Sequence, residues 1–374
     1  MVRCDALIVG GGPAGSTCAR TLRQAGWDVV VIDRARFPRD KVCAGWVTPP
    51  VFDLLDLDPS EYKAAGLTIQ EITGFRTSLI GRTPVDTRYP RVISYAIRRY
   101  EFDDFLLRRS GARVLEGTPL TSLVRRDGVW VANEAVTAPV VIGAGGHFCP
   151  VARQLQSGGS ARALKTSASR NPPYTVPVVV AKEAEFRLDP DSSSVAGEMP
   201  ELFFCSDLEG YGWCVRKGPY LNIGIGRRDH GDLSQHVGDF IAFLEQHGLA
   251  RRASSVRWRG HAYLASGTGL RPLAGEGVML CGDAAGLAYP ESGEGIKPAV
   301  ESGRLAADTL VAAGGRVGTE DLDAYALEIR RRYPPVRPAR GPIRAAMRAA
   351  GRALLHSRAF TRHVLIDRWF LRTV

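Results

Sequence analysis

The chain opens on two short apolar runs separated by a glycine-rich stretch. Residues 5–10 read DALIVG, residues 11–26 read GGPAGSTCARTLRQAG, and residues 27–33 read WDVVVID. Short apolar runs bounded by glycine are typical of buried strands, and the segment between them reads as a helix. The pattern predicts a strand, a helix and a second strand, the first βαβ unit of a dinucleotide-binding fold.

The turn of this unit carries the spacing Gly10-x-Gly12-x-x-Gly15. Such glycines allow a tight turn, close approach of the backbone to a pyrophosphate at the helix N-terminus, and close packing of the helix. Asp33, at the end of the second strand, is placed to bind a ribose hydroxyl. The positions expected to bind the nucleotide in this unit are Gly10, Gly12, Pro13, Ala14, Gly15, Asp33 and Arg34.

Later segments divide into two kinds. Residues 100–115 predict a helix followed by a strand, and residues 138–146, APVVIGAGG, predict a buried strand that ends in glycines. Between 174 and 262, apolar runs are broken by Asp, Gly and Pro, which predicts antiparallel strands. The strand–turn–helix pattern then returns at 277–311, so the chain leaves its first domain and re-enters it.

We therefore expect an α/β fold with a Rossmann-like nucleotide-binding domain, an inserted, mainly antiparallel β-sheet substrate domain, and a helical C-terminal tail. The nucleotide-binding domain would comprise residues 1–72, 95–165 and 263–315, and the substrate domain residues 73–94 and 166–262. Residues 316–374 would form a basic helical region.

Composition limits the compartment and the partners. The chain has 374 residues, of which 45% are hydrophobic and 24% charged, as in ordinary globular proteins. Its seven cysteines are scattered without C-x-x-C pairs, which favours free thiols over disulfides or a metal site. The first apolar run is too short for a signal peptide, and no run reaches the roughly 18 residues of a spanning helix. We expect a cytoplasmic protein.

The net charge of +10 is concentrated in the tail, since Arg330–Val374 holds twelve arginines and one acidic residue. The remainder is close to neutral, which argues against nucleic acid as a partner. Arg344, Arg348 and Arg352 recur at four-residue spacing beside apolar positions. A basic amphipathic helix of this kind can lie on an anionic membrane, and an ordinary solvated helix packed on the body explains the pattern equally well.

Two further glycine turns follow apolar strands, GAGG at 143–146 and CGDAAG at 281–286. Loosely held NAD needs one such turn, whereas a long cofactor lying across the sheet uses several. Asp283 is placed to accept a hydrogen bond from a ribityl hydroxyl. The helix that opens at Gly293-x-Gly295-Ile296 would present its positive end to a reduced flavin ring.

These motifs resemble the FAD-binding fold of p-hydroxybenzoate hydroxylase-like flavoproteins, and among them the geranylgeranyl reductase family. The GxGxxG start, the GDAAG turn and the SGEGI helix start carry the resemblance, which covers roughly residues 1–315. It implies an FAD-dependent oxidoreductase. The cofactor-binding residues that it adds are Lys41, Arg99, Gly143, Gly282, Asp283, Pro290, Gly293, Gly295 and Ile296.

Two segments resemble the reductase family in particular. PRDKVCAG, at 38–45, is similar to its Pro-x-x-x-x-Cys segment, in which the cysteine faces the flavin pocket. YGWCVRKGPYLNIGIG, at 211–226, is similar to its Tyr-x-Trp-x-Phe-Pro segment, which lines an isoprenoid tunnel, although Val215 and Arg216 replace the Phe-Pro. The candidates that follow are Cys43 as catalytic residue and Trp46, Tyr211 and Trp213 as substrate-binding residues.

One stretch departs from the flavin hydroxylases. In GAGGHFCPVAR, Gly145 and Cys149 stand where those enzymes have an aspartate and a serine, and only Arg153 matches. Because that aspartate helps to hold the pyridine nucleotide, the departure disfavours use of NADPH in the hydroxylase manner. We expect the electron donor to be NAD(P)H or a reduced ferredoxin or flavin.

Local sequence leaves two roles open. Cys43 is either a buried structural thiol, the usual state of free cysteine, or a residue that faces the flavin. Tyr211 and Trp213 alternate by two and so share one face of a strand, where they either line a tunnel or form an aromatic core contact.

The expected function is reduction of carbon–carbon double bonds in an isoprenoid or other long apolar substrate. Saturating an alkene requires a hydride at one carbon and a proton at the other. The Cys43 thiol or water could supply the proton. One alternative is an oxygen-using monooxygenase or halogenase of secondary metabolism, which the departures at Gly145 and Cys149 and the absence of a Trp-x-Trp-x-Ile-Pro run disfavour. A second alternative is a non-redox FAD protein such as an isoprenoid cyclase.

Overall fold

The computed structural model describes residues 1–156, 178–189, 192–228, 232–266, 271–334 and 341–372. By its contacts the chain divides into two compact units. Unit 1 comprises residues 1–39, 100–176 and 263–336, and unit 2 comprises 40–99, 177–262 and 337–374. The functional domain boundaries expected from the sequence stay a prediction.

Unit 1 is built on a six-stranded sheet in the order β19-β20-β13-β2-β3-β9. Its neighbouring strands are parallel, except for the antiparallel pair β19 and β20. All residues of β2, β3, β13 and β20 are buried, which explains their continuous apolar runs. The strands are β2 (Ala6–Val9), β3 (Val29–Ile32), β9 (Arg113–Leu115), β13 (Val140–Gly143), β19 (Ala274–Gly275) and β20 (Val278–Leu280).

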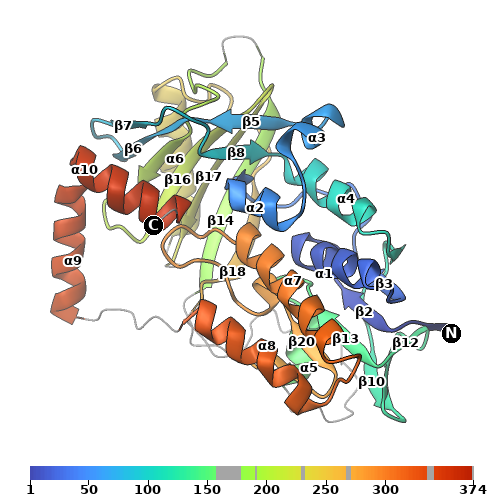
Figure 1. Cartoon of the computed structure of the whole chain (residues 1–374). Helices are drawn as coiled ribbons and strands as arrows, with labels where there is room; N and C mark the ends of the chain where they lie inside the picture. Colours follow the sequence, from blue (N-terminus) through green and yellow to red (C-terminus); the bar gives the residue numbers. More distant parts are fainter. Residues whose placement is uncertain (157–177, 190–191, 229–231, 267–270, 335–340, 373–374) are drawn as a thin grey trace. The chain divides into compact units, whose positions relative to one another are not determined.

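Helices complete the core of unit 1. Figure 1 shows α1 (blue) beside α7 (orange), and these two helices pack against one another. A Cβ on Gly303 would lie 2.2 Å from the backbone oxygen of Ala14, so only glycine allows this approach. The helices are α1 (Pro13–Gln24), α4 (Arg99–Arg109), α5 (Pro150–Gln156), η1 (Gly282–Ala284), α7 (Ile296–Ala312) and α8 (Thr319–Arg332).

A second sheet of unit 1 has four short strands in the order β1-β12-β11-β10. They are β1 (Val2–Arg3), β10 (Leu123–Arg126), β11 (Val129–Ala132) and β12 (Val136–Ala138).

Unit 2 centres on a seven-stranded sheet in the order β18-β14-β17-β16-β15-β6-β7. The strands from β14 to β15 are antiparallel to their neighbours, whereas β15 and β6 are parallel. The strands are β6 (Gly74–Leu79), β7 (Val85–Arg88), β14 (Val178–Arg187), β15 (Glu201–Phe204), β16 (Gly210–Lys217), β17 (Tyr220–Arg227) and β18 (Arg259–Leu264).

Among the described residues of unit 2, a smaller sheet and six helices accompany the large sheet. The small sheet has the order β4-β8-β5, from β4 (Trp46–Val47), β5 (Ile69–Ile72) and β8 (Ser94–Ile97). The helices are α2 (Pro49–Leu54), α3 (Pro59–Ala64), α6 (Leu233–Gln246), α9 (Gly341–Leu354), α10 (Arg358–Phe360) and the π-helix η2 (Thr361–Leu371).

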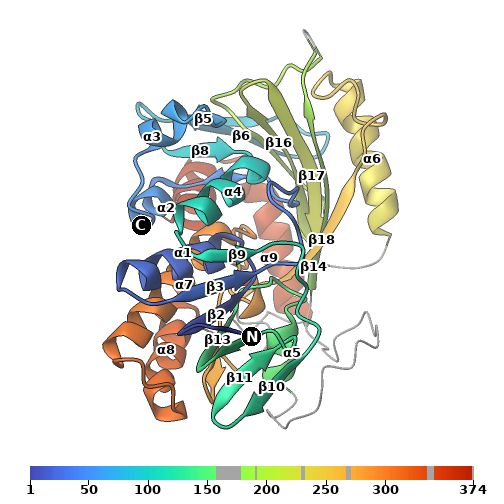
Figure 2. The ribbon, with the colours of Figure 1, turned by 90° about the vertical axis from the view of Figure 1, so that its right-hand side faces the viewer.

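Different helices cover the two faces of the large sheet. Figure 2 shows α6 (yellow) along β16 and β17, where Phe240 and Leu244 share a core with Ile223 of the sheet. On the opposite face, Ile366 and Phe370 of η2 belong to a separate apolar cluster with sheet residues. The C-terminal segment is therefore part of the core of unit 2.

The expected fold class is confirmed: an α/β nucleotide-binding fold, a mainly antiparallel second sheet and C-terminal helices. The predicted strand, helix and strand at the N-terminus are β2, α1 and β3. The stretch RRRYPPVRPARGP, which reads as a linker, begins inside α8, and its residues 335–340 lie outside the described residues. Among the described helices, none has both the length and the apolar character needed to cross a membrane.

Candidate functional site

Three glycine turns meet at one edge of the parallel sheet in unit 1. They follow β2, β13 and β20, which are neighbours in the sheet, so their carboxyl ends lie together. Gly10 has φ +115°, and a Cβ there would lie 2.4 Å from the backbone oxygen of Ala144 in the second turn. A Cβ on Gly282, in the third turn, would lie 3.3 Å from Cβ of Ala14. The structure thus brings all three predicted turns together.

The N-terminus of α1 is shaped to receive a negative group. A Cβ on Gly15 would lie 1.9 Å from the backbone oxygen of Gly10, so the helix starts directly against the turn. Gly12 is the N-cap residue and has no side chain to cover the first-turn N–H groups, and Pro13 follows it. These residues fit a pyrophosphate, which the helix N-terminus attracts.

Asp33 is fixed at the same turn. Its Oδ2 accepts a hydrogen bond from the Gly11 N–H (2.7 Å), and its Oδ1 accepts one from the Ala35 N–H (2.8 Å). A carboxylate has about four lone-pair sites, so Asp33 can also accept from ribose hydroxyls. Arg34 is exposed beside it.

Arg39 is a candidate that the sequence reasoning missed. Its Nη2 lies 3.5 Å from the position of a Cβ on Gly12, so its guanidinium faces the turn. The same atom pairs with the buried carboxylate of Asp103 at 3.0 Å. No spacing motif marks Arg39, because its position depends on how the chain folds back after β3.

The third turn meets the start of α7. The helix begins at Ile296, as the sequence predicts, with Gly295 as its N-cap residue. A Cβ on Gly295 would lie 3.2 Å from Oδ1 of Asp283, which places this carboxylate at the helix start. Gly293 has φ +71°, and Pro290 is half-buried in the loop before it.

Buried Arg271 holds this region together and was also missed. It donates hydrogen bonds to the backbone oxygens of Ala284 (2.8 Å) and His147 (3.3 Å). It thereby joins the second and third turns. It lies in a loop-like stretch of the sequence, without a motif that could have marked it.

The departure from the hydroxylase motif has a packing consequence. Gly143 ends β13, and a Cβ on Gly145 would lie 3.3 Å from Sγ of Cys149, which is buried. Burial raises the pKa of the Cys149 thiol. Arg153, the matching residue of the motif, is exposed.

In unit 2, Cys43 lies in the loop before β4. It is half-buried, whereas the other six cysteines are buried. Its Sγ accepts a hydrogen bond from the Gly45 N–H at 3.4 Å. Nearby in the sequence, Lys41 Nζ lies 2.8 Å from Nε2 of His261.

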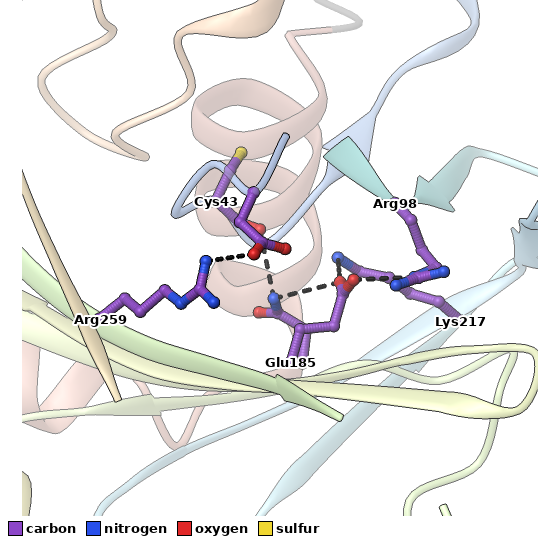
Figure 3. A network of polar contacts seen from close by, with 7 residues as sticks. Cys43, Arg98, Glu185, Lys217 and Arg259 are labelled. Atoms are coloured by element: carbon purple, nitrogen blue, oxygen red, sulfur yellow. Dashed lines mark hydrogen bonds and ion pairs between the residues drawn. The ribbon is translucent and has the colours of Figure 1, made fainter. Parts of the chain in front are cut away.

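A polar network supports this loop from the large sheet (Figure 3). Asn222 Nδ2 donates to the backbone oxygen of Cys43 at 3.3 Å. Glu185 pairs with Lys217 (2.6 Å) and with Arg98 (2.9 Å). In the view of Figure 3, the Cys43 sulfur points away from Glu185.

The network holds charges that are withdrawn from water. The side chain of Lys217 is 0% exposed. Burial on its own would raise the pKa of Glu185, but the charges of Lys217 and Arg98 outweigh it and lower that pKa. Gly45 has φ +67°, and a Cβ there would lie 2.6 Å from Lys217 Nζ. The Cys43 loop therefore lies directly against the buried charges.

The three predicted substrate residues share one aromatic cluster with the C-terminal helix η2. The ring of Trp46 stacks on Phe370 (5.3 Å between centroids), and Tyr211 meets Phe370 edge-on (5.6 Å). Trp213 lies 6.0 Å from Tyr211, and both belong to one face of β16, as expected. The contact with Phe370 was not foreseen.

Trp213 connects this cluster to the polar network. Its Nε1 donates to Oδ1 of Asn222 at 2.7 Å. A Cβ on Gly224 would lie 2.2 Å from the Trp213 ring, so glycine is required for the ring to lie across β17. Arg99, the remaining predicted residue, is 8% exposed at the start of α4.

The sheet and its three glycine turns define the class of FAD-dependent oxidoreductases. A family model described as "FAD dependent oxidoreductase" matches residues 5–104. A menaquinone reductase of Mycobacterium tuberculosis is 30% identical over 337 residues, covering 82% of this chain and 76% of that protein. A digeranylgeranylglycerophospholipid reductase of Methanothrix thermoacetophila is 30% identical over 347 residues, covering 87% and 82%.

A solved structure shares the fold. The geranylgeranyl bacteriochlorophyll reductase-like protein of Thermoplasma acidophilum superimposes with a TM-score of 0.70 at 21% identity, covering 95% of this chain and 88% of that chain. The chain belongs to the geranylgeranyl reductase family of FAD-dependent oxidoreductases. Its cofactor is FAD.

We predict that Asp33→Ala weakens FAD binding by about tenfold or more, because the carboxylate holds the Gly11 turn and would accept from the ribose. Titrating apoprotein with FAD and following the flavin fluorescence measures the affinity. Asp28→Ala, at the exposed residue just before the same strand, is the matched control. Equal affinities of the two variants would contradict the assignment.

Proposed function

We propose that this protein reduces carbon–carbon double bonds of a long isoprenoid-type substrate. The observation that carries the proposal is the double contact of Asn222. Its Nδ2 donates to the Cys43 backbone and its Oδ1 accepts from Trp213. One side chain thus ties a half-buried thiol to an aromatic cluster suited to an apolar chain. The names of the two relatives, which refer to menaquinone and to a digeranylgeranyl lipid, support the same substrate class.

Each group has a distinct task in this proposal. Reduced FAD, when bound, supplies the hydride. The glycine turns and Asp33 hold the cofactor, and Trp46, Tyr211 and Trp213 hold the apolar chain. Cys43 delivers a proton from its thiol to the second carbon, so the double bond is replaced by two new C–H bonds. Water then restores the thiol proton. We propose NAD(P)H, or a reduced ferredoxin or flavin, as the electron donor.

Reoxidation of the flavin tests the reaction. The flavin of the purified protein is reduced chemically without oxygen, and geranylgeranyl diphosphate is then added. We expect rapid reoxidation of the flavin and one saturated bond per flavin oxidised, detected by mass spectrometry. Rapid reoxidation by air with an oxygenated product, and no response to the alkene, would refute the reductase activity.

The variant Cys43→Ala tests the proton donor in the same assay. Loss of a positioned general acid slows the chemical step by about 100-fold or more. Reoxidation of the flavin by oxygen does not need this proton donor and serves as the control. If the variant reduces the alkene at the wild-type rate, water is the donor and Cys43 has no chemical role.

We also propose that α9 lies on an anionic membrane, where such substrates reside. Arg344 and Arg348 pair with Glu209 of the body, which fixes how the helix is turned about its axis. Ile343 and Met347 lie on the neighbouring face of the helix, about 100° around the axis, and are 66% and 62% exposed. Exposed apolar side chains next to arginines are typical of helices that bind the membrane interface.

We predict that Met347→Asp weakens binding to vesicles of mixed anionic and neutral lipid by at least about tenfold, because it removes an apolar side chain that would enter the lipid and adds a charge that anionic lipids repel. Co-sedimentation with the vesicles measures the binding. Leu327→Asp is the matched control, since Leu327 is similarly exposed (64%) on α8, in unit 1. Unchanged binding of Met347→Asp would contradict a membrane role for α9.

A further inference from the structure

An ion pair between Arg39 and Asp103 lies beside the N-terminus of α1 in unit 1. Arg39 follows β3 in the chain, and Asp103 lies on α4. Arg39 Nη2 is 3.0 Å from Asp103 Oδ2, and the two side chains are 19% and 0% exposed. The same Nη2 atom lies 3.5 Å from the position that a Cβ on Gly12 would take. A buried carboxylate therefore holds a partly exposed guanidinium against the turn between β2 and α1.

Other side chains pack around the same turn. The guanidinium carbon of Arg39 lies 4.8 Å from the centre of the Phe37 ring, a cation–π contact. The tip of that ring lies 3.2 Å from the position of a Cβ on Gly11. Leu107, one helical turn after Asp103 on α4, lies 3.0 Å from the same position. The ring and α4 both rest on the turn, so the guanidinium is held from two sides.

The burial of Asp103 determines how Arg39 is oriented. A buried charge is costly unless it is paired. Because pairing with Arg39 offsets this cost, the folded protein favours the arginine conformation that reaches Asp103. A guanidinium has five N–H donors in a planar fork, so a guanidinium that is paired with one carboxylate still has donors for a second anion.

We propose that Arg39 binds the pyrophosphate of FAD and that Asp103 is a positioning residue, which holds the guanidinium in place before FAD binds. Gly12, the N-cap residue of α1, has no side chain to cover the first-turn N–H groups, and Arg39 adds a full positive charge there. A helix N-terminus and a guanidinium both attract phosphate oxygens. An oriented side chain also loses less entropy on binding, which increases the affinity. This role is independent of the proposed reductase activity.

The effect of removing the Asp103 charge distinguishes two roles for this residue. If Asp103 only neutralised Arg39, its loss would strengthen the attraction of the guanidinium for phosphate. If Asp103 positions Arg39, its loss releases the guanidinium from the turn and weakens the binding of phosphate. The proposal therefore requires that Asp103→Asn lowers the affinity for FAD.

The affinities of the apoprotein for FAD, ADP and adenosine separate the phosphate contacts from the rest of the site. Flavin fluorescence reports the binding of FAD, and competition with FAD reports the binding of ADP and adenosine. We expect FAD and ADP to bind about tenfold or more weakly to Arg39→Gln, and about threefold or more weakly to Asp103→Asn, because charge-assisted hydrogen bonds are lost or misaligned. We expect the affinity for adenosine, which carries no phosphate, to stay unchanged.

Matched controls lie on the same two helices. Asp104→Asn removes the next carboxylate of α4, which pairs with Arg108 at 3.1 Å, and Arg23→Gln removes an exposed arginine at the far end of α1. We expect both controls to bind all three ligands like the wild type. The double variant Arg39→Gln/Asp103→Asn should bind FAD no more weakly than Arg39→Gln alone, because Asp103 acts through Arg39.

Three results would overturn the proposal. They are an affinity of Asp103→Asn for FAD that is unchanged or higher, a loss of adenosine binding equal to the loss of ADP binding, and equal effects of the variants and their controls. An equal loss for all ligands would show that the substitutions only disturb the structure of the turn. Each result concerns binding alone, so it leaves the reductase activity to its own test.

A measurement on the wild type covers the case in which the variants do not fold. Phenylglyoxal modifies accessible arginine side chains, and peptide mass spectrometry identifies the modified residues. We expect saturating ADP to slow the modification of Arg39, whereas saturating adenosine does not. Arg23 is the internal reference and should react at the same rate with either ligand. No protection of Arg39 by ADP, or equal protection by the two ligands, would overturn the proposal.

Discussion

The ion pair of Lys217 and Glu185 is the constraint on which the candidate site in unit 2 depends. Burying both charges costs several kcal/mol per ion, and the cost is offset only when geometry and additional hydrogen bonds are good. Here the pair is 2.6 Å long, Arg98 provides a second cation, and Asn222 contacts the same carboxylate. Because Gly45 lies against Lys217, the arrangement fixes the path of the Cys43 loop. If the loop moved away and exposed Lys217, these contacts would be lost and only hydration would replace them. The position of the loop and the burial of the charges therefore depend on one another.

Unit 1 depends on a different constraint, the close approach of backbones at three glycines. Gly10, Gly15 and Gly303 each lie where a Cβ would collide with a backbone oxygen. These contacts bring the turns and helices together around the expected position of the cofactor. The same fold carries many chemistries, so it specifies FAD but not the reaction. In the proposed function, the chemistry that distinguishes this chain comes from Cys43 and the residues that support its loop.

How much of the structure the sequence predicted depends on whether a feature is determined by adjacent residues or by residues far apart in the chain. The turns at Gly10 and Gly282 and the start of α7 could be predicted, because a few adjacent residues determine each of them. Lys217 and Glu185 could not, since charged residues that alternate with apolar ones on a strand normally indicate a face exposed to solvent. The burial of the Lys217 side chain in the folded protein shows that this face is covered. Phe370 was missed for a similar reason: its partner Trp46 is more than three hundred residues away in the chain.

A crystal structure of the FAD-loaded protein tests the central claim most directly, namely that the loop held by Lys217, Glu185 and Asn222 presents Cys43 to the flavin. The measured quantity is the distance from Cys43 Sγ to the nearest atom of the flavin ring. The account predicts van der Waals contact, within about 4.5 Å, with the hydrogen bond from Asn222 to the Cys43 backbone in place. A Cys43 side chain that packs away from the ring, with this hydrogen bond intact, would contradict it.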